Sequence, residues 1–144
     1  RREMTINEIQ DEIIEEFSLF DDWLDKYDYL ISLSDTLEAI DPTKRNDKYK
    51  IEGCQSSVWV SAELRDGVMY YTADSDAIIT KGIIALLVRV MNGRTPEEAA
   101  NIDLYFVDAI GLGENLSPTR SNGLRAMIAQ MKLDARILAE RKER

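Results

Sequence analysis

The sequence contains one cysteine, Cys54, and no histidine, and this combination limits the chemistry available to the chain. Cys54 stands in the polar stretch Gly53–Ser57, directly before the strand-like run Val58–Val60. One thiol cannot close an internal disulfide, and a zinc site needs about four ligands. The thiol is therefore either packed as an inert small side chain or used for single-thiol chemistry, such as the covalent carriage of a group.

Other catalytic and binding signatures are absent from the sequence. Without histidine there is no Ser-His-Asp or Cys-His arrangement to activate a nucleophile. The chain has no Gly-x-x-x-x-Gly-Lys-Ser/Thr phosphate loop and no Gly-x-Gly-x-x-Gly dinucleotide turn. Its carboxylates match no hydrolase or calcium-loop pattern. We therefore expect that the protein is not an enzyme acting alone and that it binds no metal.

A thiol with a reference pKa of about 8.5 must be made more acidic, or must meet a reactive donor, to act at neutral pH. Without histidine, help comes from a helix N-terminus, from backbone amides, or from lysine and arginine. Lys81 and Arg120 are the candidates, although each also fits a solvated surface charge.

The net charge of −9 is unevenly spread along the chain. Residues 3–41 contain 13 acidic residues and a single basic one, Lys26, whereas residues 42–144 are nearly neutral. Such an acidic region repels phosphate backbones, so we do not expect nucleic-acid binding. The pattern fits two solvated helix faces or, alternatively, a surface that favours a basic partner.

The 144 residues suffice for one hydrophobic core, and no linker divides them, so a single domain over residues 1–144 is expected. Residues 1–4 are expected to lie outside the fold, as disordered or non-native residues. No apolar run has the length of a membrane span, and the N-terminus lacks the apolar core of a signal peptide. Together with a single unpaired cysteine, this predicts a cytoplasmic protein without membrane contact.

Helical signals dominate the first forty residues. Thr5–Glu8 matches a capping box, and the apolar residues from Ile6 to Phe20 recur at helical spacing behind it. A second helix is expected to begin near Asp21 or Asp22. It is expected to end at Asp41, because the residue before a proline disfavours the helical conformation. A polar loop over residues 42–50 follows.

The alternating residues 57–64 predict a β-strand. Asp66-Gly67 predicts a type I′ turn, in which both central residues have positive φ, and Val68–Ala73 is the expected return strand. Tyr49–Ile51 is a candidate for a short additional strand. The result is a small antiparallel sheet of about three strands.

Asp74, Ser75 and Asp76 offer capping oxygens for a helix from about Ala77 to Met91. Apolar residues surround almost the whole circumference of this helix, so we expect it to be the central buried one. Three segments follow: a short helix opened by the capping box Thr95–Glu98, a helix or turn at about Asp103–Ile110, and a long terminal helix after Leu116–Ser121.

The stretch Gly53–Val60 resembles the cysteine loop of the SufE family of sulfur acceptor proteins. Three further segments resemble the family in the same order: its second helix at Trp23–Ile31, the start of its central helix at Ser75–Gly82, and its late Ser/Thr-Arg-Ser-x-Gly-Leu segment at Leu116–Leu124. The four segments span the chain from the first helix to about Ala139. The departures are small, mainly Ser57 and the loop at 42–50.

The resemblance implies an α+β fold in which a small antiparallel sheet packs against several helices, related to NifU-like iron–sulfur scaffold proteins. It also implies a function. A SufS-like cysteine desulfurase or a paralogue, which carries the pyridoxal phosphate, transfers sulfur to Cys54 as a persulfide. The protein itself, with no cofactor of its own, then relays the sulfur to an iron–sulfur assembly scaffold. The resemblance leaves open whether the chain forms a homodimer.

The resemblance also assigns roles around the thiol. Gly53, Gln55 and Ser56 shape the loop. Asp76 lies near the loop and affects its dynamics and partner binding, and Arg120 positions the loop or contacts the desulfurase. The resting cysteine is expected to be tucked under its loop, which must open when the partner binds.

Two other functions compete with sulfur transfer. The first is a regulator that binds a partner through its acidic helices, with Cys54 only packed. The second is an iron–sulfur scaffold of related fold, which the presence of only one cysteine argues against.

Overall fold

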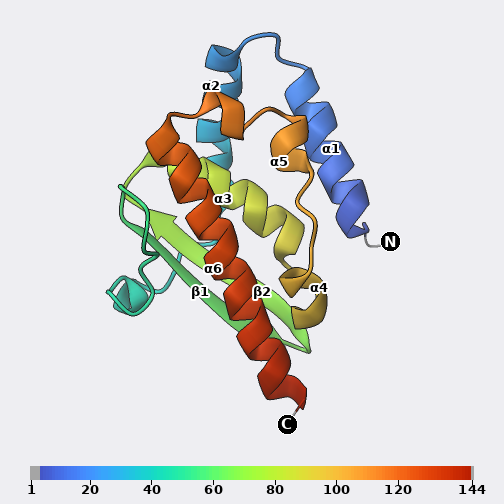
Figure 1. Cartoon of the computed structure of the whole chain (residues 1–144), viewed down its shortest axis with the longest axis vertical. Coiled ribbons are helices and arrows are strands. Elements are labelled where there is room, and N and C mark those ends of the chain that lie inside the picture. The colour runs from blue at the N-terminus through green and yellow to red at the C-terminus, as the bar shows by residue number, and fades with distance from the viewer. Residues whose placement is uncertain (1–3, 144) are drawn as a thin grey trace.

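The computed structural model describes residues 4–143 and shows a β-hairpin packed against a set of helices (Figure 1). The helices are α1 (Ile6–Ser18), α2 (Trp23–Leu33), α3 (Ile78–Met91), α4 (Pro96–Ala100), α5 (Phe106–Ala109) and α6 (Pro118–Glu143). The strands are β1 (Val58–Arg65) and β2 (Val68–Ser75). Short 3₁₀ turns are η1 (Ser34–Thr36), η2 (Pro42–Lys44) and η3 (Gly113–Asn115). The predicted α+β class is confirmed.

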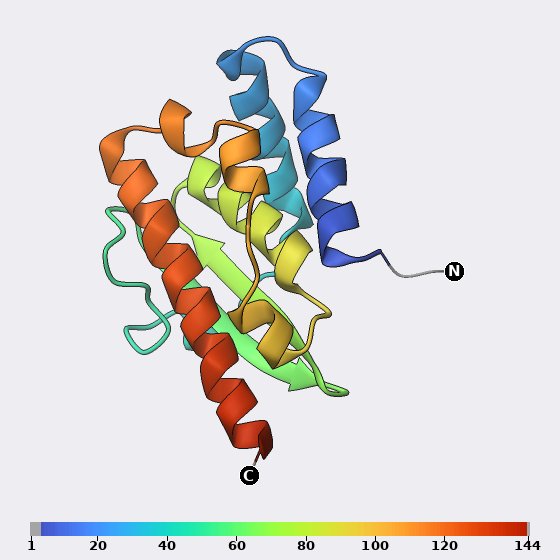
Figure 2. The same cartoon turned by 45° about the vertical axis from the view of Figure 1, so that its right-hand side comes forward.

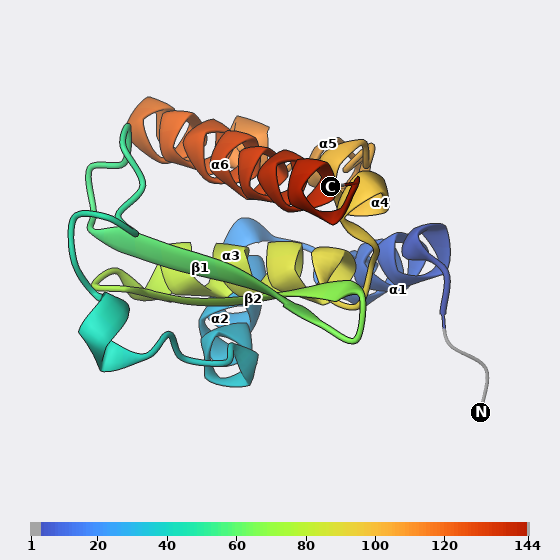
Figure 3. The ribbon, with the colours of Figure 1, turned by 90° about the horizontal axis from the view of Figure 1, so that it is seen from below.

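The elements are layered around α3. This helix packs against β2 on one side and against α1 and α2 on the other, as Figure 2 shows. Helix α6 contacts β1 and α4, and it lies on the opposite side of the hairpin from η2 (Figure 3). Ten of the fourteen residues of α3 are buried, which confirms it as the central helix.

The hairpin confirms the predicted turn and corrects the predicted strand count. Asp66 and Gly67 have φ of +54° and +83°, as a type I′ turn requires. Among the described residues the sheet has two strands, because Tyr49–Ile51 forms only one bridge, between Lys50 and Trp59. The segment is too short for a strand, since it lies between one turn at residues 46–49 and another that ends at Gly53.

The second helix ends earlier than predicted, at Leu33 instead of Asp41. The hydroxyls of Ser34 and Thr36 donate to the carbonyls of Ile31 and Leu33, at 2.6 and 2.7 Å. Side chains that bond to nearby carbonyls compete with helix propagation, and the chain leaves the helix through η1. The N-terminal cap of this helix is Asp22, within the predicted pair.

Both predicted capping boxes are present, at Thr5–Glu8 and at Thr95–Glu98. Helix α5 is shorter than the predicted span 103–110. The buried side-chain amide of Gln10 donates to the carbonyl of Asp103 and accepts from the amide of Phe106, so these backbone groups are bound before the helix begins.

The predicted disorder of residues 1–4 falls mainly on residues outside the described range. Met4 is described, and its carbonyl accepts a hydrogen bond of 2.8 Å from the Arg94 guanidinium. Within residues 4–143, no helix has the length and apolar character that a bilayer crossing requires.

Candidate functional site

Cys54 lies in the loop between Ile51 and β1, and this loop rests against α6. Gly53 has φ of +89°, a left-handed conformation that glycine adopts without strain. A Cβ at this position would stand 3.3 Å from the Cβ of Ala126, so the loop approaches the helix closely. The backbone therefore turns at Gly53 and presents the next side chain, Cys54, towards α6.

The thiol of Cys54 is half-buried and faces the first turns of α6. Its Sγ lies 3.6 Å from the carbonyl oxygen of Gly123, to which the thiol donates a weak hydrogen bond. A Cβ on Gly123 would lie 3.6 Å from Sγ, so the absence of a side chain there leaves space at the sulfur. Burial raises the pKa of the Cys54 thiol above its usual value, which favours the protonated form at rest.

A cavity of about 340 Å³ opens at the thiol. Gln55 and Ser56 line it beside Cys54, Thr80 contributes from α3, and Arg120 contributes from α6. Arg120 is exposed, and among the described residues it is the only charged one in the lining of this cavity. The prediction that Arg120 lies near the cysteine thus agrees with the structure, although the two are 66 positions apart.

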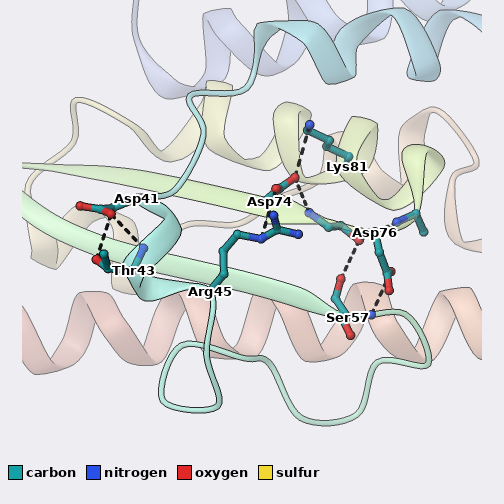
Figure 4. Close-up of polar contacts among 9 residues, drawn as sticks. Asp41, Thr43, Arg45, Ser57, Asp74, Asp76 and Lys81 are labelled. Carbon is teal, nitrogen blue, oxygen red and sulfur yellow. Dashed lines mark hydrogen bonds and ion pairs between the residues drawn. The ribbon is translucent and has the colours of Figure 1, made fainter.

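The C-terminal end of the cysteine loop is fixed to the junction between β2 and α3. Asp76 Oδ1 accepts a hydrogen bond of 3.1 Å from the amide of Ser57, and the Ser75 hydroxyl donates to the Ser57 carbonyl at 2.8 Å (Figure 4). The sequence predicted a capping role for Asp76 at α3, but its carboxylate holds the loop instead. The Ala77 amide donates to the Ser75 hydroxyl.

Lys81, a candidate activator of the thiol, does not line the Cys54 cavity. Its ammonium group lies 3.3 Å from Asp74 Oδ1, and the guanidinium of Arg45 lies 3.5 Å from the other oxygen of the same carboxylate (Figure 4). Arg45 also stacks over the ring of Trp59, 4.6 Å from its centroid. This cluster joins the loop at 42–50 to the sheet and leaves Lys81 paired with a carboxylate instead of with the thiol.

Two residues at the site were not singled out from the sequence, Gly123 and Thr80. Gly123 falls in the segment that resembles the family, but only the structure shows that it provides the carbonyl and the space beside Sγ. The available signal was a glycine inside a strongly helical pattern. Glycine lowers the stability of a helix, so its presence there indicates a place where a side chain would not fit. Thr80 also falls in a segment that resembles the family, Ser75–Gly82, but no other signal pointed to it.

The fold and the site define an α+β domain with one accessible thiol in a pocket between a loop and a helix. The chain belongs to the SufE family: residues 11–135 match the family model described as "SufE: Fe-S metabolism associated domain". An uncharacterized SufE-like protein of Rhizobium etli is 37% identical over 134 residues, which cover 90% of each chain.

Other relatives and a solved structure agree. An uncharacterized SufE-like protein of Rhizobium meliloti is 35% identical over 87% of this chain and 93% of its own. One from Synechocystis sp. is 35% identical over 85% of this chain and 77% of its own. The solution structure of a hypothetical protein from Thermus thermophilus superposes with a TM-score of 0.73 at 21% identity, covering 89% of this chain and 93% of that one, which supports the fold.

Proposed function

We propose that this protein accepts sulfur from a pyridoxal-phosphate-dependent cysteine desulfurase as a persulfide on Cys54, activates that enzyme by removing its sulfur, and passes the sulfur to an iron–sulfur assembly scaffold. The reducing cytoplasm, where an unpaired thiol persists, is its proposed location. The observation that carries the proposal is the position of the sole cysteine in a pocket of about 340 Å³. Such a pocket has room for one more sulfur atom.

The transfer is an exchange between sulfur atoms. The Cys54 thiolate attacks the terminal sulfur of the desulfurase persulfide, and a new bond forms between the two sulfurs. The sulfur–sulfur bond of the desulfurase persulfide breaks, and its cysteine leaves as a thiolate. One such bond replaces another, so no oxidant or reductant is consumed. This chemistry needs a thiolate but no histidine, in keeping with the composition of the chain.

The loop must open for this exchange. In the free protein the thiol is half-buried and its pKa is raised, so the nucleophilic thiolate is scarce. Contact with the desulfurase moves Cys54 out of the pocket and into reach of the persulfide. After transfer, the pocket beside Gly123 shields the new persulfide from solvent. Arg120 lines the same cavity, where it positions the loop or contacts the desulfurase.

The test is the intact mass of the protein after incubation with free cysteine and a cognate desulfurase. We expect a gain of one sulfur, located at Cys54 and removed by a thiol reductant. The Cys54→Ser variant is expected to bind the desulfurase and to lose its stimulation. As a positional control, Cys54→Ser combined with Ser56→Cys places a thiol two residues along the same loop and is not expected to restore stimulation. Full stimulation by Cys54→Ser would refute sulfur transfer.

The second candidate, a regulator that acts through its acidic helices, is favoured by one observation. Asp21, Asp25 and Asp28 form no ion pair among the described residues, and the exposed fractions of Leu19 and Leu24 beside them are 77% and 76%. In that case stimulation survives replacement of Cys54 and weakens as salt is added, since exposed charges are screened. The Cys54→Ser assay therefore separates the two functions.

A further inference from the structure

A second cavity, of about 360 Å³, lies at the edge of β1. Its walls come from residues 44–50, from the middle of β1 and from the C-terminal half of α6. It shares no lining residue with the Cys54 cavity within the described part of the chain. On α6, Gly123 beside the thiol and Asp134 in the second cavity are about 16 Å apart at a rise of about 1.5 Å per residue, and the two linings approach within one turn at Met127 and Gln130.

Four cations line this second cavity, which we call the basic groove: Lys44, Lys48, Lys50 and Arg141. None of the four belongs to an ion pair between residues that the structure describes. Among the lining residues whose side chains the structure describes, the only carboxylate is Asp134, which accepts a hydrogen bond of 2.9 Å from Gln130. A protein with a net charge of −9 thus gathers four cations against a single carboxylate.

Two of the ammonium groups are held at one aromatic ring. The Nζ atoms of Lys44 and Lys48 lie 5.6 and 5.4 Å from the ring centroid of Tyr49, and Lys44 Nζ lies 3.4 Å from the Ser61 hydroxyl. The ring attracts each cation, but the two cations repel each other. An anionic ligand would remove this repulsion, so the arrangement indicates a site for negative charge.

The walls of the groove show what kind of anion fits. Val60 and Ala62 of β1 face Ile137 and Leu138 of α6, and Ile137 is 38% exposed. A small inorganic anion would leave these apolar side chains uncovered. A protein segment with both acidic and apolar side chains would cover them and neutralise the cations at the rim.

Helix α1 of a second copy does not supply such a segment. The apolar residues of α1, such as Ile13 and Phe17, are buried in the core of their own molecule. The exposed side of α1 therefore offers acidic side chains to a second copy, but not the apolar side chains that are buried in its own core.

The turn between α1 and α2 exposes Leu19 and Leu24 beside Asp21 and Asp25, but the two leucines lie at the end of one helix and the start of the next and form no continuous apolar face. We therefore assign the groove to a segment of another protein, and self-association is an outcome of the test.

We propose that the basic groove is a second docking site, which binds an acidic, amphipathic segment of a partner protein while the Cys54 cavity stays free. The inference does not depend on sulfur transfer, because the two cavities have separate described linings. A segment held in the groove therefore contacts no described residue that lines the Cys54 cavity.

The test is an NMR titration of the ¹⁵N-labelled protein with a short helical peptide of glutamate and leucine, whose leucines lie at helical spacing. We expect saturable shifts at Lys44, Lys50 and Arg141 and none at Gly123. The double variant Lys48→Glu, Arg141→Glu changes two exposed side chains and should bind the peptide roughly tenfold more weakly, equivalent to about 1.4 kcal/mol. The same peptide with glutamine in place of glutamate should not bind.

The matched control is Arg136→Glu, which reverses an exposed cation on α6 outside the groove and should leave the affinity unchanged. An equal loss in this control would refute the site, since it would show a general effect of net charge. Absence of saturable binding, or shifts centred on Gly123, would also refute it. Tighter binding of inorganic pyrophosphate than of the peptide would assign the groove to small anions. Self-association in sedimentation, abolished by the double variant, would assign it to a second copy; either result overturns the proposal.

Discussion

At the scale of single residues, the reactivity of Cys54 depends on how firmly its loop is closed. Three groups bind the backbone of Ser57: the carboxylate of Asp76, the hydroxyl of Ser75 and the backbone amide of Asp76. These contacts lie three residues beyond the thiol. Their loss should raise the population of the open loop, in which Cys54 is accessible.

Asp76→Ala removes the acceptor for the Ser57 amide, whereas Asp76→Asn keeps an oxygen at the same place. We expect the alanine variant to react with iodoacetamide about fivefold faster, because one net hydrogen bond is worth about 1 kcal/mol. The asparagine variant should react at nearly the wild-type rate. Alkylation rates of the native free protein measure this, with near-ultraviolet circular dichroism to confirm the fold. Equal rates in all three proteins would mean that other contacts keep the loop closed.

The same residues show what could be predicted of the site. Cys54, Gln55, Ser56 and Arg120 were predicted from composition and family resemblance, and all four line one cavity. The place of Asp76 near the loop came from the family resemblance alone, because its position before a helix predicts a cap. Only the fold brings the Ser57 amide to its carboxylate.

At the scale of elements, helices α2 and α3 pack with their backbones in close contact. Gly82 of α3 faces the backbone of Leu30 in α2, and a Cβ on Gly82 would stand 2.1 Å from the Leu30 oxygen and 2.8 Å from its carbonyl carbon. A backbone group cannot rotate away as a side chain can. The two helices must therefore separate if any side chain is added.

Gly82→Ala should lower the free energy of unfolding by about 3 kcal/mol, the upper range for overpacking a core. Urea denaturation measures this. Gly113→Ala is the control, because nothing lies within 4 Å of a Cβ there and its φ is not positive. The control should stay within about 0.5 kcal/mol of wild type, as surface substitutions do. A similar small effect for Gly82→Ala would show that α2 can move away from α3 at little cost.

Element types were easier to predict than element ends. The turn residues Asp66-Gly67 and the two capping boxes act locally, so the sequence alone determined them. The end of α2 at Leu33 and the short α5 depend on hydroxyl and amide groups that compete for backbone carbonyls. For α5 the competing group is Gln10, which is 93 positions from Asp103 in sequence, and no local pattern could reveal it.

At the scale of the whole molecule, one cation of the central helix, Arg89, binds two carboxylates of the acidic α1. Arg89 of α3 donates two hydrogen bonds to the carboxylate of Glu16, at 2.9 and 2.6 Å, and another to Glu12. The hydroxyl of Tyr29 also donates to Glu16. The hydrogen bonds from Arg89, together with that from Tyr29, lower the pKa of Glu16 against the opposing effect of burial.

This shift links the stability of the fold to pH. A carboxyl whose pKa is lowered in the folded state stabilises the fold above its unfolded value of about 4.3. The contribution is lost as the pH falls through the folded value. Arg89→Met should therefore cost about 1–2 kcal/mol at about pH 7, allowing for the partial exposure of Arg89. At about pH 3 the difference between the variant and wild type should shrink, because Glu16 is then losing its charge.

Urea denaturation at the two pH values measures this difference, and Arg125→Met provides the control. Arg125 is exposed and donates to the side-chain oxygen of Asn122 rather than to a carboxylate, so its replacement should give a small difference that does not change with pH. A pH-independent loss in Arg89→Met would mean that Arg89 contributes through the packing of its aliphatic stem. A loss that shrinks at low pH would mean that the ion pairs attach α1 to α3, and that acid weakens this attachment.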